Sequence, residues 1–263
     1  MFIIHGTTRK VRNLGCVADF CPICRSIQAF DLKRLGLASH IYFISLGEGK
    51  LTGHIIQCRR CGVQLKAEPE TYSAREKRHA RIIDVESLIH STYPNIREVY
   101  ARRLAFEERL KKSPGDIPPE MRAEYMMEPF RLLNPGVEET YKGQTNFDKQ
   151  SSIGCIGTMA SSIGLCALGL YLHDRANLQS TILGIMSACF VVGTIYTVVQ
   201  LFLARGRYVR TKVMPKLVQS LSPFHPLSGE VSALLEKCKT GGLLIGKKLK
   251  IDRVMKELEA APK

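Results

Sequence analysis

Four cysteines in two close pairs are the residues of this sequence best suited to chemistry. Cys21 and Cys24 are separated by two residues, as are Cys58 and Cys61, so both sulfurs of a pair can reach one ion. Four thiolates in a tetrahedron are typical of a closed structural zinc site, which leaves no position for a substrate. The spacing therefore predicts a structural Zn²⁺ held by these four residues. Two disulfides, or four unrelated thiols, are the alternatives.

No catalytic or cofactor-binding constellation is predicted elsewhere in the chain. The helical acidic residues Glu107, Glu108, Glu120, Glu124 and Glu128 lack the accompanying histidines of a di-metal site, and they indicate a solvated acidic face. The run from Gly241 to Lys248 resembles a phosphate-binding loop, but Lys248 stands where a serine or threonine should hold magnesium. We therefore expect a protein that is not an enzyme.

Other polar residues near the cysteines have two interpretations each. Cys16 is predicted to be a packed strand residue, with a redox or alternative-ligand role as the other interpretation. His40 and His54 are predicted to lie at the surface or to support the ligands, because four cysteines already complete a tetrahedron. Basic residues around the pairs form a solvated positive face or a phosphate-contacting surface; they are Arg9, Lys10, Arg12, Arg25, Arg59 and Arg60.

The elements that must position the cysteines are short β-strands. Ile41–Ile44 and His54–Gln57 are rich in strand-forming residues, and glycines at 47 and 49 indicate a turn between them. Gly62 follows the second pair, where a tight turn favours a positive φ. The sequence thus predicts a small β zinc ribbon over residues 1–70, which metal binding would largely stabilise.

This segment resembles a bacterial zinc-ribbon family found at the N-termini of small membrane proteins. The resemblance rests on the start Phe2–Gly6, on Cys21-Pro22-x-Cys24, and on Cys58-x-x-Cys61-Gly62. It implies a zinc-ribbon fold with zinc ligated by the four thiolates, and it implies no activity. Members of the family often carry glycine after the first pair, where this chain has Arg25, so the resemblance does not extend to the geometry of that turn.

Residues 71–149 are predicted to form a cytoplasmic helical segment. The pattern favours a helix between Ser73 and Ser91, and a second that begins at Asn95 in a capping box and ends near Lys112. A third helix opens at Pro118-Pro119 and is expected to stop at Asn134-Pro135-Gly136.

Residues 150–204 are predicted to form a two-helix transmembrane hairpin with spans at about 151–173 and 179–204. The segments 150–173 and 176–204 contain no charged residue, and each exceeds the roughly 20 residues that cross a bilayer. Basic residues flank both outer ends, which predicts an integral membrane protein with both termini cytoplasmic. The cysteines suit such a reducing compartment, and no signal peptide is recognised at the N-terminus.

Residues 205–263 are predicted to form a basic, helical, cytoplasmic C-terminal segment. They carry 13 basic and 5 acidic residues, in a chain of 263 residues with a net charge of +14. The fold class is thus multidomain: a β zinc ribbon, a helical segment, a membrane hairpin and a basic helical tail. The expected function is that of a membrane-anchored binding or scaffolding module. Its expected partners are the lipid bilayer, a protein, and a second copy through the transmembrane helices; membrane-tethered nucleic-acid binding is the alternative.

Overall fold

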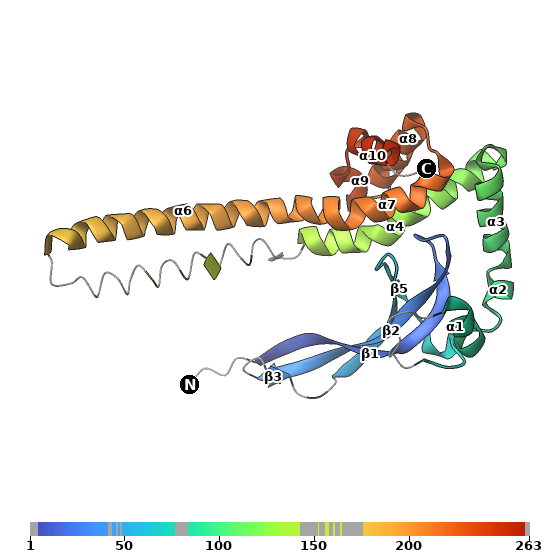
Figure 1. The fold of residues 1–263 in the computed structure, drawn as a ribbon, viewed down its shortest axis with the longest axis horizontal. Coiled ribbons are helices and arrows are strands. Elements are labelled where there is room, and N and C mark those ends of the chain that lie inside the picture. Colours follow the sequence, from blue (N-terminus) through green and yellow to red (C-terminus); the bar gives the residue numbers. More distant parts are fainter. Residues whose placement is uncertain are drawn as a thin grey trace. The chain divides into compact units, whose positions relative to one another are not determined.

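A computed structural model shows the fold of this chain as two compact units (Figure 1). The first unit combines residues 1–133 with residues 216–263, and the second comprises residues 134–215. The structure describes residues 5–41, 44–45, 47, 49–76, 84–142, 152, 156–157, 160, 164 and 176–260.

An antiparallel sheet forms the N-terminal part of the first unit. Its strand order is β1-β2-β4-β5, and the two-residue β3 also pairs with β2. The strands are β1 (His5–Cys21), β2 (Ser26–Ile41), β3 (Ile44–Ser45), β4 (Lys50–Cys58) and β5 (Gln64–Lys66). β1 and β2 have 17 and 16 residues, so they form a long ribbon where the sequence predicted only short strands. The predicted strand residues Tyr42 and Phe43 lie outside the described residues.

A bulge at Gly15 lets β1 approach the segment that follows the sheet. The pairing of β1 with β2 shifts register between Asn13 and Gly15, and Gly15 has a φ of +145°. A Cβ atom at this position would lie 2.8 Å from the Glu76 carbonyl oxygen. The neighbouring Cys16 amide donates to that same oxygen at 2.9 Å. Glycine therefore allows the close approach that joins Glu76 to the edge of the sheet.

Short helices follow the sheet in the first unit. They are α1 (Val85–Thr92), α2 (Ile96–Val99) and α3 (Ala101–Lys112), with the 3₁₀ turns η1 (Pro69–Thr71) and η2 (Pro114–Asp116). Asp84 caps α1 by accepting from two backbone amides. The Ala18 amide of β1 donates to Thr92 Oγ1 at 3.0 Å, so the end of α1 is bonded directly to the sheet. α4 (Pro119–Lys142) comes next in the chain.

The C-terminal part of the first unit is a cluster of short helices. These are α7 (Met214–Leu221), η4 (Ser222–Phe224), α8 (Ser228–Thr240), α9 (Leu244–Lys248) and α10 (Ile251–Glu259). Gly246 of the phosphate-loop-like run packs tightly here, because a Cβ would lie 2.6 Å from Cys238 Cβ. This glycine thus serves helix packing.

The second unit contains α6 (Ala176–Tyr208), which continues into a turn of π-helix, η3 (Val209–Val213). Within this unit a Cβ at Gly136 would lie 2.6 Å from Tyr208 Oη, and Arg205 lies over the Tyr141 ring at 5.9 Å. The last turns of α4 therefore pack against the end of α6.

The predicted stop of α4 at Asn134-Pro135-Gly136 is wrong, because the helix continues to Lys142. Proline removes one backbone donor, yet side chains support the turns that follow. Asn134 donates to Glu138 at 2.7 Å, and Thr140 donates to the Gly136 carbonyl oxygen at 2.8 Å. Asn95 does precede a helix, but its side chain makes no capping hydrogen bond.

The predicted transmembrane hairpin is also corrected. Most of the first span, about 151–173, lies outside the described residues, and the second, 179–204, falls on α6. No helix in the described part of the chain is both long enough and apolar enough to cross a membrane. Polar groups recur along the end of α6, where Arg207 donates to Gln200 Oε1 at 2.6 Å. For the described residues, the predicted fold class with its membrane hairpin and the integral-membrane localisation are therefore wrong.

Candidate metal centre

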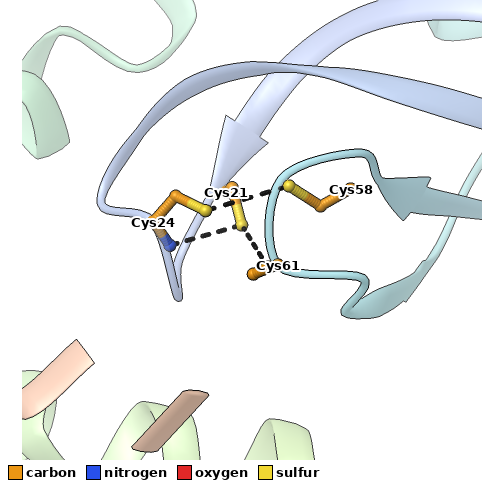
Figure 2. Close-up of side chains that lie close together, drawn as sticks. All are labelled: Cys21, Cys24, Cys58 and Cys61. Atoms are coloured by element: carbon orange, nitrogen blue, oxygen red, sulfur yellow. Dashed lines mark hydrogen bonds between the residues drawn. The ribbon is translucent and has the colours of Figure 1, made fainter. Parts of the chain in front are cut away.

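The four predicted cysteines meet at the base of the β1–β2 ribbon (Figure 2). Cys21 ends β1 and Cys24 lies in the turn to β2, whereas Cys58 ends β4 and Cys61 lies in the turn to β5. Their Sγ atoms all lie within 4.8 Å of one another. The structure thus brings together two pairs that are more than thirty residues apart in the sequence.

The sulfur spacing fits a single tetrahedral ion. A Zn–S bond of about 2.3 Å places tetrahedral sulfurs about 3.8 Å apart. Here the Cys21–Cys61 and Cys24–Cys58 sulfurs are 3.5 and 3.9 Å apart. A disulfide requires about 2.05 Å, and all four thiols are free. The structure therefore joins none of these thiols in a disulfide, and it brings all four together at a spacing that a single metal ion could occupy.

Two matched turns carry the cysteine pairs. The Arg25 amide donates to the Cys21 carbonyl oxygen at 2.7 Å, and the Gly62 amide donates to that of Cys58 at 2.8 Å. The residue after each pair has a left-handed backbone, with a φ of +58° at Arg25 and +71° at Gly62. Gly62 adopts the conformation predicted from the sequence. For Arg25 this backbone costs about 1 kcal/mol, which its side chain must offset.

The thiols perturb one another because they share a small, partly buried space. A hydrogen bond with Cys24 and further bonds to the other two thiols raise the pKa of Cys21. Hydrogen bonds with Cys21, and then with Cys24 and Cys61, lower the pKa of Cys58. Four thiolates cannot all carry charge at this spacing without a compensating cation. The cluster is therefore suited to a metal ion, which would hold all four sulfurs as thiolates.

The Arg25 side chain ties the first cysteine turn to α3. It is 5% exposed, and its Nε and Nη2 donate to the two carboxylate oxygens of Glu107 at 2.6 and 2.9 Å. Arg103 also donates to Glu107, at 2.9 Å, and donates to Glu128 at 2.6 Å. These four residues form a charge network that is buried at Arg25 and Glu107 and partly exposed at Arg103 and Glu128. The predicted solvated face is therefore wrong for Glu107, which is buried, and nothing in the sequence around Glu107 links it with Arg25.

Residues from the C-terminal helices complete the surroundings of this turn. Arg25 Nη1 donates to the Ser220 carbonyl oxygen at 3.3 Å, and its guanidinium lies 4.4 Å from the centre of the Phe224 ring. Gln219 Nε2 lies 3.7 Å from Cys24 Sγ and donates to it. The first cysteine turn is therefore contacted by α3 and by the consecutive elements α7 and η4, from two distant parts of the chain.

A buried carboxylate supports the strand that leads into the first pair. Asp19 is 7% exposed and accepts from Tyr72 Oη at 2.5 Å and from Tyr100 Oη at 3.0 Å. Burial raises the pKa of Asp19, and the hydrogen bond from Tyr72 opposes that rise. These bonds fasten the end of β1 to η1 and to the start of α3.

The other candidates from the sequence lie outside the cluster. Cys16 is buried in β1 and its thiol donates to Asp31 at 3.4 Å, which confirms the interpretation as a packed strand residue. His54 pairs with Arg34 across the sheet, and the side chain of His40 lies outside the described residues. Arg59 donates to Asp31 at 2.9 Å, whereas Arg60 is exposed.

Comparison with protein families, curated proteins and solved structures finds no match to this chain. The resemblance to the bacterial zinc-ribbon family therefore rests on the sequence motifs named above and on the geometry of the cysteines alone. Within the described residues, no second group of three or more histidine, cysteine or acidic side chains could hold a metal ion. The four cysteines are thus the candidate metal centre, and they form a module consistent with a zinc ribbon.

Proposed function

We propose that this protein is a non-catalytic binding module in which Zn²⁺, held by Cys21, Cys24, Cys58 and Cys61, fixes the base of a protein-binding β-ribbon. Zinc is favoured because four soft thiolates at tetrahedral spacing suit it better than calcium or magnesium, which prefer oxygen ligands. With four protein ligands the ion would have no open position, so its role is structural.

The observation that carries the proposal is the positive charge of the far part of the ribbon. We call residues 9–13, 33–37 and 50–53 the distal ribbon. Across these residues there is no Asp or Glu, and six basic side chains are present: Arg9, Lys10, Arg12, Lys33, Arg34 and Lys50. At about 3.3 Å per residue, Arg9 lies roughly 40 Å along β1 from Cys21. The distal ribbon is therefore a basic arm that projects from the metal-stabilised base.

Exposed apolar side chains accompany the charge. Val11 is 57% exposed and Leu37 is 41% exposed. Arg9 pairs with Leu37, and Val11 with Leu35, so these side chains share one face of the sheet. Apolar and basic groups together suit a protein that presents acidic and apolar side chains. In the described part of the distal ribbon, β1 also pairs on one side only, with β2, which leaves an edge that can accept another strand.

Nucleic-acid binding is the second candidate, and the absence of acidic residues from the distal ribbon favours it. A two-stranded ribbon can enter a major groove, and basic residues contact phosphates. No aromatic side chain lies in residues 9–13, 33–37 or 50–53 to stack on bases. We therefore rank it below protein binding.

Site-specific photocrosslinking tests the protein-binding proposal. A photoreactive amino acid at Val11 of the full chain should crosslink one protein from native extract, and Arg12→Glu in the same chain should abolish that product. The matched control places the probe at Val99, which is 56% exposed on α2. An identical product from both positions, or one that survives Arg12→Glu, would refute the assignment of the ribbon.

A gel-shift titration tests the second candidate function, nucleic-acid binding. Binding of a DNA duplex or single-stranded RNA that weakens steeply between about 50 and 200 mM salt would support nucleic acid as the partner. No shift at the lower salt would exclude it.

A further inference from the structure

A groove lies between α3 and the start of α4, away from the cysteine turns. It has a volume of about 710 Å³ and is bounded by α3, η2 and the first turns of α4. Its apolar lining includes Phe106, Ile117, Met121 and Tyr125. The Phe106 and Tyr125 rings are stacked with their centres 3.9 Å apart, and Met121 is 45% exposed. This volume falls in the range of small-molecule sites, about 300–1,000 Å³.

Three cations surround this apolar lining. Arg102, Arg109 and Lys112 all line the groove and all are exposed. They lie at intervals of seven and three along α3, which places them along one side of the helix. None of the three makes an ion pair with a described residue, and the groove has one acidic lining residue, Asp116. The rim is therefore positive around an aromatic interior.

The walls of the groove are held in place by Arg122. Its Nη1 donates to the Pro114 carbonyl oxygen of η2 at 3.2 Å. Its Nε donates to Glu230 at 2.8 Å, and its Nη2 donates to the Phe224 carbonyl oxygen at 2.6 Å. Because the η2 turn and the α4 start are bonded to buried parts of the unit, the groove is preformed and needs no ligand to shape it.

We propose that this groove binds a small organic anion with an apolar body and a single carboxylate. The apolar body packs against Phe106, Met121 and Tyr125, and the carboxylate is held by Arg109 and Lys112 at the rim. Charge decides the class of ligand, since a cation would face three positive side chains and a neutral molecule would leave them without a partner. The volume favours a small molecule over a macromolecular segment.

A tryptophan reporter tests the proposal with decanoate as the probe. The chain contains no tryptophan, so Ser113→Trp in the full chain, at a lining residue to which the proposal assigns no contact, reports only from the groove. Decanoate should shift this emission in a saturable way below its micellar concentration, and decyltrimethylammonium should not. Val99→Trp, which lies outside the groove on α2, reports non-specific association and should show no saturable shift.

A matched pair of charge reversals locates the carboxylate. Lys112→Glu in the reporter chain should weaken decanoate binding about tenfold or more, as expected for loss of a charged hydrogen bond. Lys111→Glu changes the net charge equally, but Lys111 does not line the groove, so binding should change less than about threefold. Equal effects of the two substitutions, or equal binding of the cationic and anionic probes, would overturn the proposal.

Discussion

Loss of the Glu107 carboxylate should destabilise the first unit far more than loss of a surface carboxylate. Glu107 accepts three N–H bonds at 2.6–2.9 Å, two from Arg25 and one from Arg103. Burial lowers the pKa of Arg25, and the nearby Glu107 carboxylate opposes that shift. In Glu107→Ala the guanidinium of Arg25 would remain buried without a counter-charge.

The magnitude follows from burial. Removing one partner of a buried ion pair costs about 3–5 kcal/mol, because the other charge stays desolvated. Glu86 provides the matched comparison: Arg97 donates to both its oxygens at 2.6 Å, but the two side chains are 59% and 61% exposed. An exposed pair contributes only about 0–1 kcal/mol. The two substitutions should therefore differ by roughly 2–5 kcal/mol.

Urea unfolding followed by circular dichroism, with zinc present in excess, measures this difference. Glu107→Gln preserves the side-chain shape and keeps the comparison possible if the alanine variant does not fold. Because Arg25 directly follows Cys24, Glu107→Ala should also speed transfer of the metal to a coloured chelator. Free energies of unfolding for Glu107→Ala and Glu86→Ala that agree within about 1 kcal/mol would show that this network does not stabilise the unit.

Three further predictions concern the metal, the pH dependence and thiol reactivity. Purified protein should contain one zinc per chain by elemental analysis, and the Cys58→Ser variant should contain none. Retention of zinc in Cys58→Ser, or its loss in the control variant Cys16→Ser, would contradict the ligand assignment. Hydrogen bonds from Arg122 lower the pKa of Glu230 below its usual 4.5, so its stabilisation is present above pH 4.5 and is lost as pH falls through the lowered pKa. Glu230→Gln should thus lower the free energy of unfolding by at most about 1 kcal/mol at pH 7, and by progressively less below pH 4.5, in paired urea titrations. A loss of stability that does not depend on pH would refute the assigned role of the Glu230 carboxylate. Burial raises the pKa of Cys238 to about 11, so at pH 8 roughly 1 in 1,000 of these thiols is ionised, and peptide mapping should find it unmodified by iodoacetamide until the protein unfolds.

The features of the site that depend on residues close together in the sequence could be predicted. The two-residue spacing within each pair identified all four clustered cysteines, and Gly62 identified a left-handed turn. The ribbon was recognised as β-structure, but its length was not, because alternation is weak where residues 15–21 are buried on both faces of β1.

The features of the site that depend on contacts between residues far apart in the sequence could not be predicted. Glu107 and Glu108 look alike in the sequence, yet one is buried beside Arg25 and the other is exposed. The only local indication of this contact was Arg25, at a position where the resembled family often has glycine. The helix end predicted at Pro135 was wrong for a related reason, because hydrogen bonds from nearby side chains let α4 continue past this residue. The predicted second copy of the chain stays a prediction, as does the absence of catalysis.

The order in which the chain emerges during synthesis bears on how the metal is acquired. The Ser220 carbonyl oxygen that receives Arg25 lies 195 residues further along the chain. At about 5–20 residues per second, the cysteine pairs would wait roughly 10–40 s for α7 and η4 to be made. If the four thiolates bind zinc as proposed, the ion could enter before α7 and η4 are made, while the first cysteine turn is still uncovered on that side.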